Sequence, residues 1–120
     1  MGPMTGRRFE VAIDANDPGR LRRFWAVALN YREHTTAEGA VDLIDPAQQG
    51  PIVWFQQVPE RRTTAKNRLH LDIMVPADER AALTEQLVAL GGTVAATHQG
   101  FTVMADPEGN ELCLTDSEPR

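Results

Sequence analysis

The first strand can be located from the alternation of apolar and polar side chains. Residues 9–14, FEVAID, place Phe9, Val11 and Ile13 on one face and mostly polar residues on the other. A period of two is typical of a strand that is buried on one side. We therefore predict a half-buried strand whose uncovered face begins with Glu10.

A helix is predicted next, within residues 15–31, ANDPGRLRRFWAVALNY. Asp17 is a suitable N-cap, and Pro18 fits the first helical position because no backbone N–H is needed there. Asn30 tolerates the left-handed conformation that often ends a helix. Apolar residues between these ends recur at the spacing of one buried stripe: Leu21, Phe24, Ala28 and Leu29.

The first half continues with extended segments separated by turn-forming residues. These segments lie near residues 32–37, 40–45 and 52–58, and the polar stretch 59–67 follows them. The predicted order of the first half is therefore βαβββ.

The second half repeats this order. A strand is predicted at 68–75 and a helix at 77–92, with Asp78 as its expected cap. Three further strands follow in the segments TVAATH, FTVMAD and ELCLTD. An offset of about 60 residues superimposes the halves and aligns Glu10 with His70.

The repeat predicts an α+β fold in which two βαβββ modules form one pseudo-symmetric domain. On the last strands, the same alignment pairs Ile52 with Glu111. We expect these parts along the chain: a leader at 1–7, one domain at 8–116 made of a module at 8–58, a linker at 59–67 and a module at 68–116, and a tail at 117–120.

Each module has one helix, which can cover only one face of its sheet. The residues suited to the covered faces are Phe9, Val11, Ile13, Leu69, Leu71, Ile73, Leu112 and Leu114. The opposite faces carry Glu10, Ala12, Asp14, His70, Asp72, Met74, Glu111 and Cys113. If the two sheets curve toward each other, the second set lines a cleft.

Composition excludes several classes of protein. The 120 residues, 42% of them hydrophobic, suffice for one domain with a core, and the net charge of −5 argues against nucleic acid as the partner. Cys113 is the single cysteine, so no disulfide forms within the chain, and a reducing cytoplasm is expected. No run approaches the length of a membrane span, so we expect no membrane partner.

Three stretches resemble the vicinal-oxygen-chelate superfamily, which includes glyoxalase I, extradiol dioxygenases and bleomycin-resistance proteins. They are KNRLHLDI, DPEGNELCL and DPGRLRRFWAVALNY, and the wider likeness covers about residues 8–116. The resemblance implies a cupped mixed sheet around one cleft for a small molecule, and a homodimer. It does not indicate whether the cleft forms within one chain or between two.

The resemblance also implies a metal site at four positions: Glu10, Ile52, His70 and Glu111. Ile52 cannot bind a metal, so the implied ligands are Glu10, His70 and Glu111. Such a set suits one divalent ion of zinc, nickel, manganese or iron. Glu111 and Glu10 are then the candidate catalytic residues, because a carboxylate can move the substrate's proton.

Two functions remain open on this basis. The first is a metal-dependent lyase, isomerase or dioxygenase acting on a small oxygenated metabolite. The second is a metal-free protein that sequesters a drug or metabolite, which the replacement of a ligand by Ile52 favours. In that case His70 serves only as a polar partner of the carboxylates. The expected ligand-binding residues are Trp54, Asp72 and Cys113.

Overall fold

The computed structural model describes residues 5–117, so most of the predicted leader and tail, at 1–4 and 118–120, lies outside the described residues. The elements are β1 (Glu10–Ala15), α1 (Pro18–Leu29), β2 (Arg32–Thr35), β3 (Val41–Ile44), β4 (Ile52–Gln57), β5 (Leu71–Val75), α2 (Arg80–Ala89), β6 (Thr93–His98), β7 (Phe101–Ala105) and β8 (Glu111–Asp116). This order confirms the predicted repeat of two βαβββ modules.

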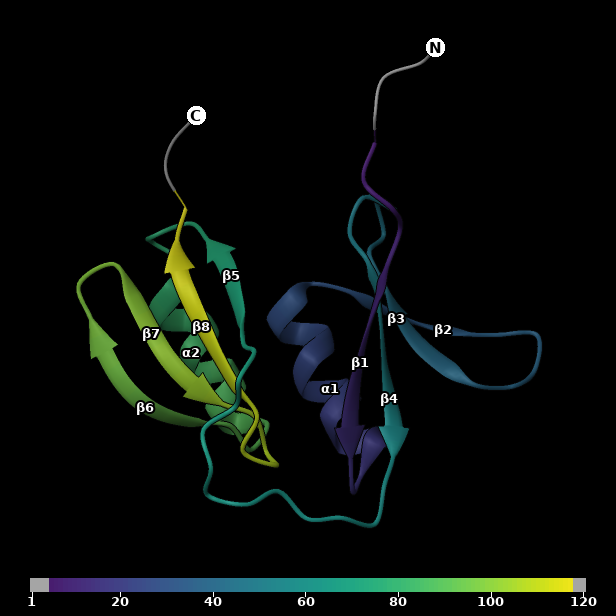
Figure 1. Cartoon of the computed structure of the whole chain (residues 1–120). Coiled ribbons are helices and arrows are strands. Elements are labelled where there is room, and N and C mark those ends of the chain that lie inside the picture. The colour runs from purple at the N-terminus through teal and green to yellow at the C-terminus, as the bar shows by residue number, and fades with distance from the viewer. Residues whose placement is uncertain (1–4, 118–120) are drawn as a thin grey trace.

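Both modules have the same sheet topology. The first four-stranded sheet has the order β1-β4-β3-β2, and the second has the order β5-β8-β7-β6. In each sheet the first and last strands of the module pair in parallel, and the remaining pairs are antiparallel. The two sheets stand apart in Figure 1 and are joined by the linker that runs along one end of the molecule.

The ends of α1 follow the local sequence signals. The Asp17 carboxylate accepts a hydrogen bond from the backbone N–H of Arg20 at 3.2 Å, and Asn30 ends the helix with φ 54° and ψ 43°. In α2 the predicted cap was wrong. The N-cap is Glu79 and makes no side-chain cap hydrogen bond, because the chain enters the helix through a turn that includes Asp78.

The helices occupy different places relative to the two sheets. α1 lies between the first sheet and the second module, whereas α2 covers the back of the second sheet (Figure 1). The fully buried side chains include Leu21, Phe24, Trp25, Leu43, Val53, Leu87, Met104, Leu112 and Leu114. In the described part of the chain, no helix is both long and apolar enough to cross a membrane.

Two residues expected on the covered faces are not buried. Phe9 is 68% exposed and Leu69 is 87% exposed. Each precedes the first strand of its module, since β1 begins at Glu10 and β5 at Leu71. Neither residue is therefore part of a strand that a helix covers.

The turn before β8 joins the two modules. Asp106, which is 2% exposed, accepts a hydrogen bond from the indole Nε1 of Trp25 at 2.9 Å. Glu108 in the same turn accepts hydrogen bonds from the backbone N–H groups of Asn16 and Asp17, each at 2.7 Å. The second module thus holds both a helix side chain of the first module and the turn that starts that helix.

Candidate functional site

The first sheet leaves one face uncovered by its helix. Val53 and Phe55 are buried against α1, so the residues that alternate with them point the other way. The register pairs Glu10 with Ile52 and Ala12 with Trp54 on that uncovered face. We call this surface, formed by Glu10, Ala12, Asp14, Ile52, Trp54 and Gln56, the first open face.

The second sheet has an equivalent uncovered surface. Leu112 and Leu114 are fully buried, and the strand register pairs Asp72 with Cys113 on the opposite side. We call the surface formed by His70, Asp72, Met74, Glu111, Cys113 and Thr115 the second open face. Met74, which is 61% exposed, gives it an apolar part.

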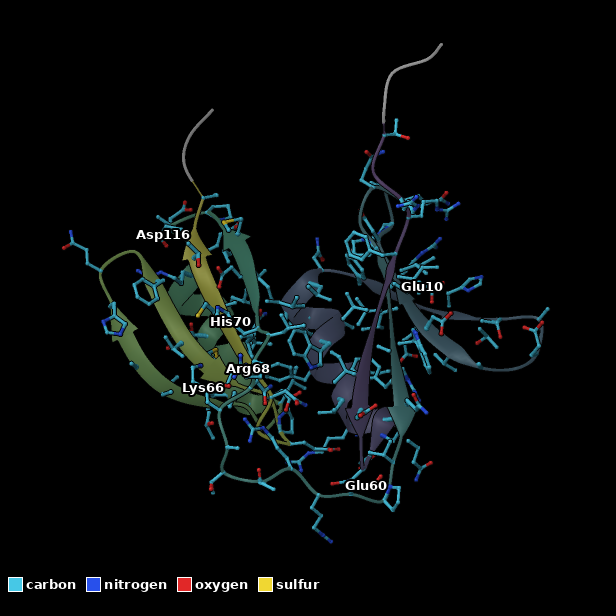
Figure 2. All side chains as sticks on the ribbon, in the orientation of Figure 1. Glu10, Glu60, Lys66, Arg68, His70 and Asp116 are labelled. Atoms are coloured by element: carbon cyan, nitrogen blue, oxygen red, sulfur yellow. The ribbon has the colours of Figure 1, made fainter. Side chains whose placement is uncertain are left out.

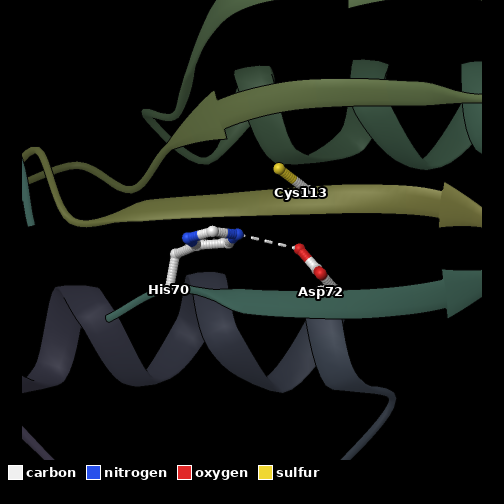
Figure 3. Close-up of side chains that lie close together, drawn as sticks. All are labelled: His70, Asp72 and Cys113. Carbon is white, nitrogen blue, oxygen red and sulfur yellow. Dashed lines mark ion pairs between the residues drawn. The ribbon is translucent and has the colours of Figure 1, made fainter. Parts of the chain in front are cut away.

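Three potential metal ligands converge on the second open face. The ligand atoms of His70, Asp72 and Cys113 all lie within 4.8 Å of one another, and no other such group of three occurs among residues 5–117. The Nε2 atom of His70 lies 3.0 Å from Oδ1 of Asp72, as Figure 3 shows. The cluster therefore combines an imidazole nitrogen, a carboxylate oxygen and a sulfur.

The surroundings of Cys113 favour its protonated form. Burial raises the pKa of the thiol, and the Asp72 carboxylate raises it further through its charge and a hydrogen bond. Without a bound cation, the sulfur is thus a weak nucleophile at neutral pH. A cation at this cluster would reverse this preference, because a coordinated thiol loses its proton.

Glu111 opens β8 as predicted, but its carboxylate is engaged with the linker. Lys66 Nζ donates to one oxygen at 2.8 Å, and the backbone N–H of Asn67 donates to the other at 2.5 Å. These two hydrogen bonds hold the pKa of the Glu111 carboxyl below its usual range, and Arg62, with a nitrogen 3.7 Å away, acts in the same direction. A carboxylate so neutralised is a poor proton acceptor.

Glu10 lies on the other module. Figure 2 shows Glu10 on the first sheet and His70 on the second. Because α1 occupies the side of the first sheet that is turned toward the second module, the first open face points away from His70. Within one chain, the structure therefore does not bring Glu10, His70 and Glu111 together.

A pocket lies at the seam between the modules. Its volume is about 350 Å³, and its apolar wall includes Val11, Ile13, Trp25 and Leu71. The polar part of its wall comes from Asn67, His70, Asn110 and Glu111. His70 therefore borders both this pocket and the metal-ligand cluster.

The chain matches known proteins in family and in fold. The model of the glyoxalase-like domain family matches residues 10–115, which is nearly the whole described chain. The chain belongs to the glyoxalase-like domain family. No curated protein matches this glyoxalase-like domain in sequence.

Solved structures share the fold at low sequence identity. The fosfomycin resistance protein FosX from Mesorhizobium loti is 12% identical with a TM-score of 0.75, covering 96% of this chain and 94% of that one. A glyoxalase/bleomycin resistance protein/dioxygenase family enzyme from Burkholderia phytofirmans is 17% identical with a TM-score of 0.69, covering 89% and 95%. These likenesses place the glyoxalase-like domain in the vicinal-oxygen-chelate superfamily.

One solved relative contains a metal ion. A FosX variant from Listeria monocytogenes was crystallised with Mn(II) and 1S,2S-dihydroxypropylphosphonic acid. It is 14% identical, with a TM-score of 0.68, and covers 93% of this chain and 90% of that one. In the present glyoxalase-like domain, the donors that fit a divalent ion are those of His70, Asp72 and Cys113.

Sequence reasoning had placed Asp72 and Cys113 on the cleft face but had not grouped them with His70. Asp72 and Cys113 are Cα partners in the parallel pair of β5 and β8, and His70 precedes Asp72 by two residues. The signal for this grouping was the alternation along the two strands. It was missed because the alignment of the halves directed attention to Glu111.

Proposed function

We propose that the protein is a metal-dependent enzyme that binds a small oxygenated molecule over the second open face and transfers a proton on it. The observation that carries this proposal is the convergence of His70, Asp72 and Cys113 on a face that no helix covers. Half-exposed ligands at such a face leave room for a substrate oxygen beside the ion.

We further propose that a second copy of the chain completes the cleft. Glu10 and Trp54 lie on the first open face, which points away from the second module of its own chain. In a homodimer, the first open face of one copy can cover the second open face of the other. The exposed apolar side chains of Phe9 and Leu69 support such an association.

The chemistry follows from the groups that this arrangement supplies. A divalent ion would polarise a substrate carbonyl oxygen and make the neighbouring C–H bond more acidic. Glu10, on the facing sheet, is the proposed proton acceptor, while Trp54 would pack against the carbon skeleton. A set with one imidazole and one thiolate suits this lyase or isomerase chemistry better than oxygen activation, which typically uses iron with two histidines and a carboxylate.

A test can use deuterium exchange into a simple α-hydroxyketone. Zinc-loaded protein in D₂O should catalyse exchange at the carbon next to the carbonyl of dihydroxyacetone or a close analogue, observed by ¹H NMR. Glu10→Gln should remove most of this exchange while zinc binding persists. The proposal would be overturned if neither the zinc-loaded nor the manganese-loaded protein exchanged any member of a panel of hydroxyketones and diketones.

A metal-free binding protein is the second candidate. Ile52, paired with Glu10, and the half-buried Trp54 form an apolar floor, and Glu10 and Asp14 would attract a cation at its border. A thermal-shift comparison of 1-methylquinolinium, neutral quinoline and anionic 2-naphthalenesulfonate distinguishes this function. Stabilisation by the cation alone, unaffected by a chelator and lost in Trp54→Ala, would favour sequestration over catalysis.

A further inference from the structure

We propose that His70, Asp72 and Cys113 bind one divalent ion of the zinc and cobalt class, with the Cys113 thiolate as a direct ligand. This inference deepens the proposed function, on whose cleft it rests, by naming the ligands and the class of ion. It replaces a set of one histidine and two glutamates with a set that includes sulfur. The choice of ion then depends on the single cysteine of the chain.

The backbone places the three ligands without long-range adjustment. β5 and β8 are parallel neighbours, and the register sets Asp72 directly beside Cys113. His70 lies two residues before Asp72, so the alternation of the strand turns both side chains to the same side. The three ligands thus come from two adjacent strands of one sheet, and their approach does not depend on a loop.

The distances fit an ion after small rotations of the side chains. The three ligand atoms lie within 4.8 Å of one another. Ligands of a tetrahedral zinc ion are separated by about 3.5 Å, given metal–ligand bonds of about 2.0–2.3 Å. The side chains of His70 and Asp72 are 42% and 54% exposed, so neither is prevented by packing from turning toward a shared ion.

The neighbouring carboxylate of Glu111 is excluded from this site by its own partners. Both of its oxygens accept hydrogen bonds from the linker, one from Lys66 and one from the backbone of Asn67. Binding a metal through Glu111 would require these contacts to break and would bring the ion toward the cationic groups of Lys66 and Arg62. Asp72 makes no such contact with the linker among the described residues and is free to bind.

The donor set predicts a preference among metals. Sulfur and imidazole favour zinc and cobalt, whereas manganese and magnesium favour carboxylate, carbonyl and water oxygens. Three protein ligands also leave the fourth position of a tetrahedral ion open for substrate or water. We therefore expect Zn(II) and Co(II) to bind far more tightly than Mn(II).

Titration with Co(II) tests this ligand set directly, without any substrate. A thiolate bound to Co(II) gives a charge-transfer band in the near ultraviolet, and Cys113 is the only residue that can produce it. The wild-type protein should develop this band with one Co(II) per chain, and added Zn(II) should abolish it. Cys113→Ser should lose the band and bind zinc at least about 100-fold more weakly, exceeding the usual effect of losing a group that only supports a ligand.

Further variants separate the two ligand sets. Asp72→Asn and His70→Gln should weaken Co(II) binding at least about tenfold. Glu111→Gln is the matched control, because it neutralises a nearby carboxylate on the same strand as Cys113, and it should keep both the band and the affinity. A band-free Co(II) complex of the wild type, or loss of binding in Glu111→Gln with binding retained in Asp72→Asn, would overturn the inference.

A measurement on the wild type avoids the risk that Cys113→Ser fails to fold. The Cys113 thiol should react with an aromatic disulfide reagent in the metal-free protein and become protected when Zn(II) is bound. Equal reactivity with and without saturating Zn(II) would count against the site. Failure of the proposed function looks different, because a protein with the cobalt band but without substrate exchange keeps this site and loses only the proposed reaction.

Discussion

The indole Nε1 of Trp25 donates a hydrogen bond to Oδ2 of Asp106 over 2.9 Å, and both residues are almost fully buried, with exposures of 1% and 2%. The pair joins α1 of the first module to the turn before β8 of the second. The same carboxylate accepts hydrogen bonds from the backbone N–H groups of Glu108 and Asn110 and from the Asn110 side chain. The stretch DPEGN therefore connects the modules as well as turning the chain into β8.

Replacement of Trp25 by Phe should destabilise the protein. The variant removes a donor to a buried carboxylate, which typically lowers the free energy of unfolding by about 1.5–3 kcal/mol. Urea unfolding followed by circular dichroism would measure this change. Trp54→Phe is the matched control, since Trp54 lies on the first open face and should change stability by less than about 0.5 kcal/mol. Equal effects of the two variants would contradict the role assigned to the Trp25–Asp106 pair.

Glu108 should protect the backbone where α1 begins. Its two oxygens accept hydrogen bonds from the N–H groups of Asn16 and Asp17 at 2.7 Å each. Glu108→Ala should therefore speed hydrogen exchange of these two amides by about tenfold, which corresponds to about 1.4 kcal/mol of local opening free energy. Glu85→Ala, at an exposed position on α2, should leave both rates unchanged. Unaltered exchange in Glu108→Ala would show that the contact contributes nothing.

The linker contact of Glu111 should weaken in acid. The hydrogen bond from Lys66 and that from Asn67 lower the pKa of the Glu111 carboxyl in the folded protein. A carboxyl with a lowered folded-state pKa stabilises the fold above its unfolded-state pKa and loses this contribution as the pH falls through the folded-state value. The amide resonance of Asn67 should follow this titration, with a midpoint below the ordinary glutamate range.

Removal of the Lys66 charge provides the control for that titration. Lys66→Gln should move the Asn67 midpoint upward, because the largest cause of the lowered pKa is lost. Lys66 is well exposed, so the substitution should not disturb the core. A midpoint that stays in the ordinary range in the wild type, or that is unchanged in Lys66→Gln, would contradict the described contact.

The proposed two-copy cleft predicts a dimer that depends on Leu69. This side chain is 87% exposed in the single chain, and its burial between copies would contribute about 1.5–3 kcal/mol. Leu69→Ser should weaken dimerisation by at least about tenfold in sedimentation experiments. Val88→Ser, at a 47% exposed position on α2, should not change it. A wild-type protein that is monomeric at all accessible concentrations would exclude the shared cleft.

Much of the architecture could be predicted because its signals are local. The alternation of β1 and β8, the cap at Asp17 and the left-handed Asn30 depend on neighbouring residues, and the structure shows each where it was expected. The repeat of two βαβββ modules follows from the order of these elements. The covered faces were largely correct for the same reason, since Leu112 and Leu114 are fully buried.

The errors arose where burial depends on the partner of a segment. Phe9 and Leu69 continue the apolar pattern of their strands, yet they precede the first paired residues and are exposed. Asp78 has a suitable side chain for a cap, but the turn before α2 moves the start of the helix beyond it. Sequence periodicity describes which residues can share a face and does not fix where a strand or helix begins.

The sequence by itself determined the two modules, the family resemblance and the residues that alternate onto the uncovered faces. Only the tertiary structure decided how those residues are grouped. Glu111 turns to the linker, His70 lies with Asp72 and Cys113, and Glu10 lies on a face directed away from them. The physical reason is that side-chain partners are set by the register of adjacent strands and by the packing of α1 between the modules, and neither is encoded in the spacing of residues along one strand.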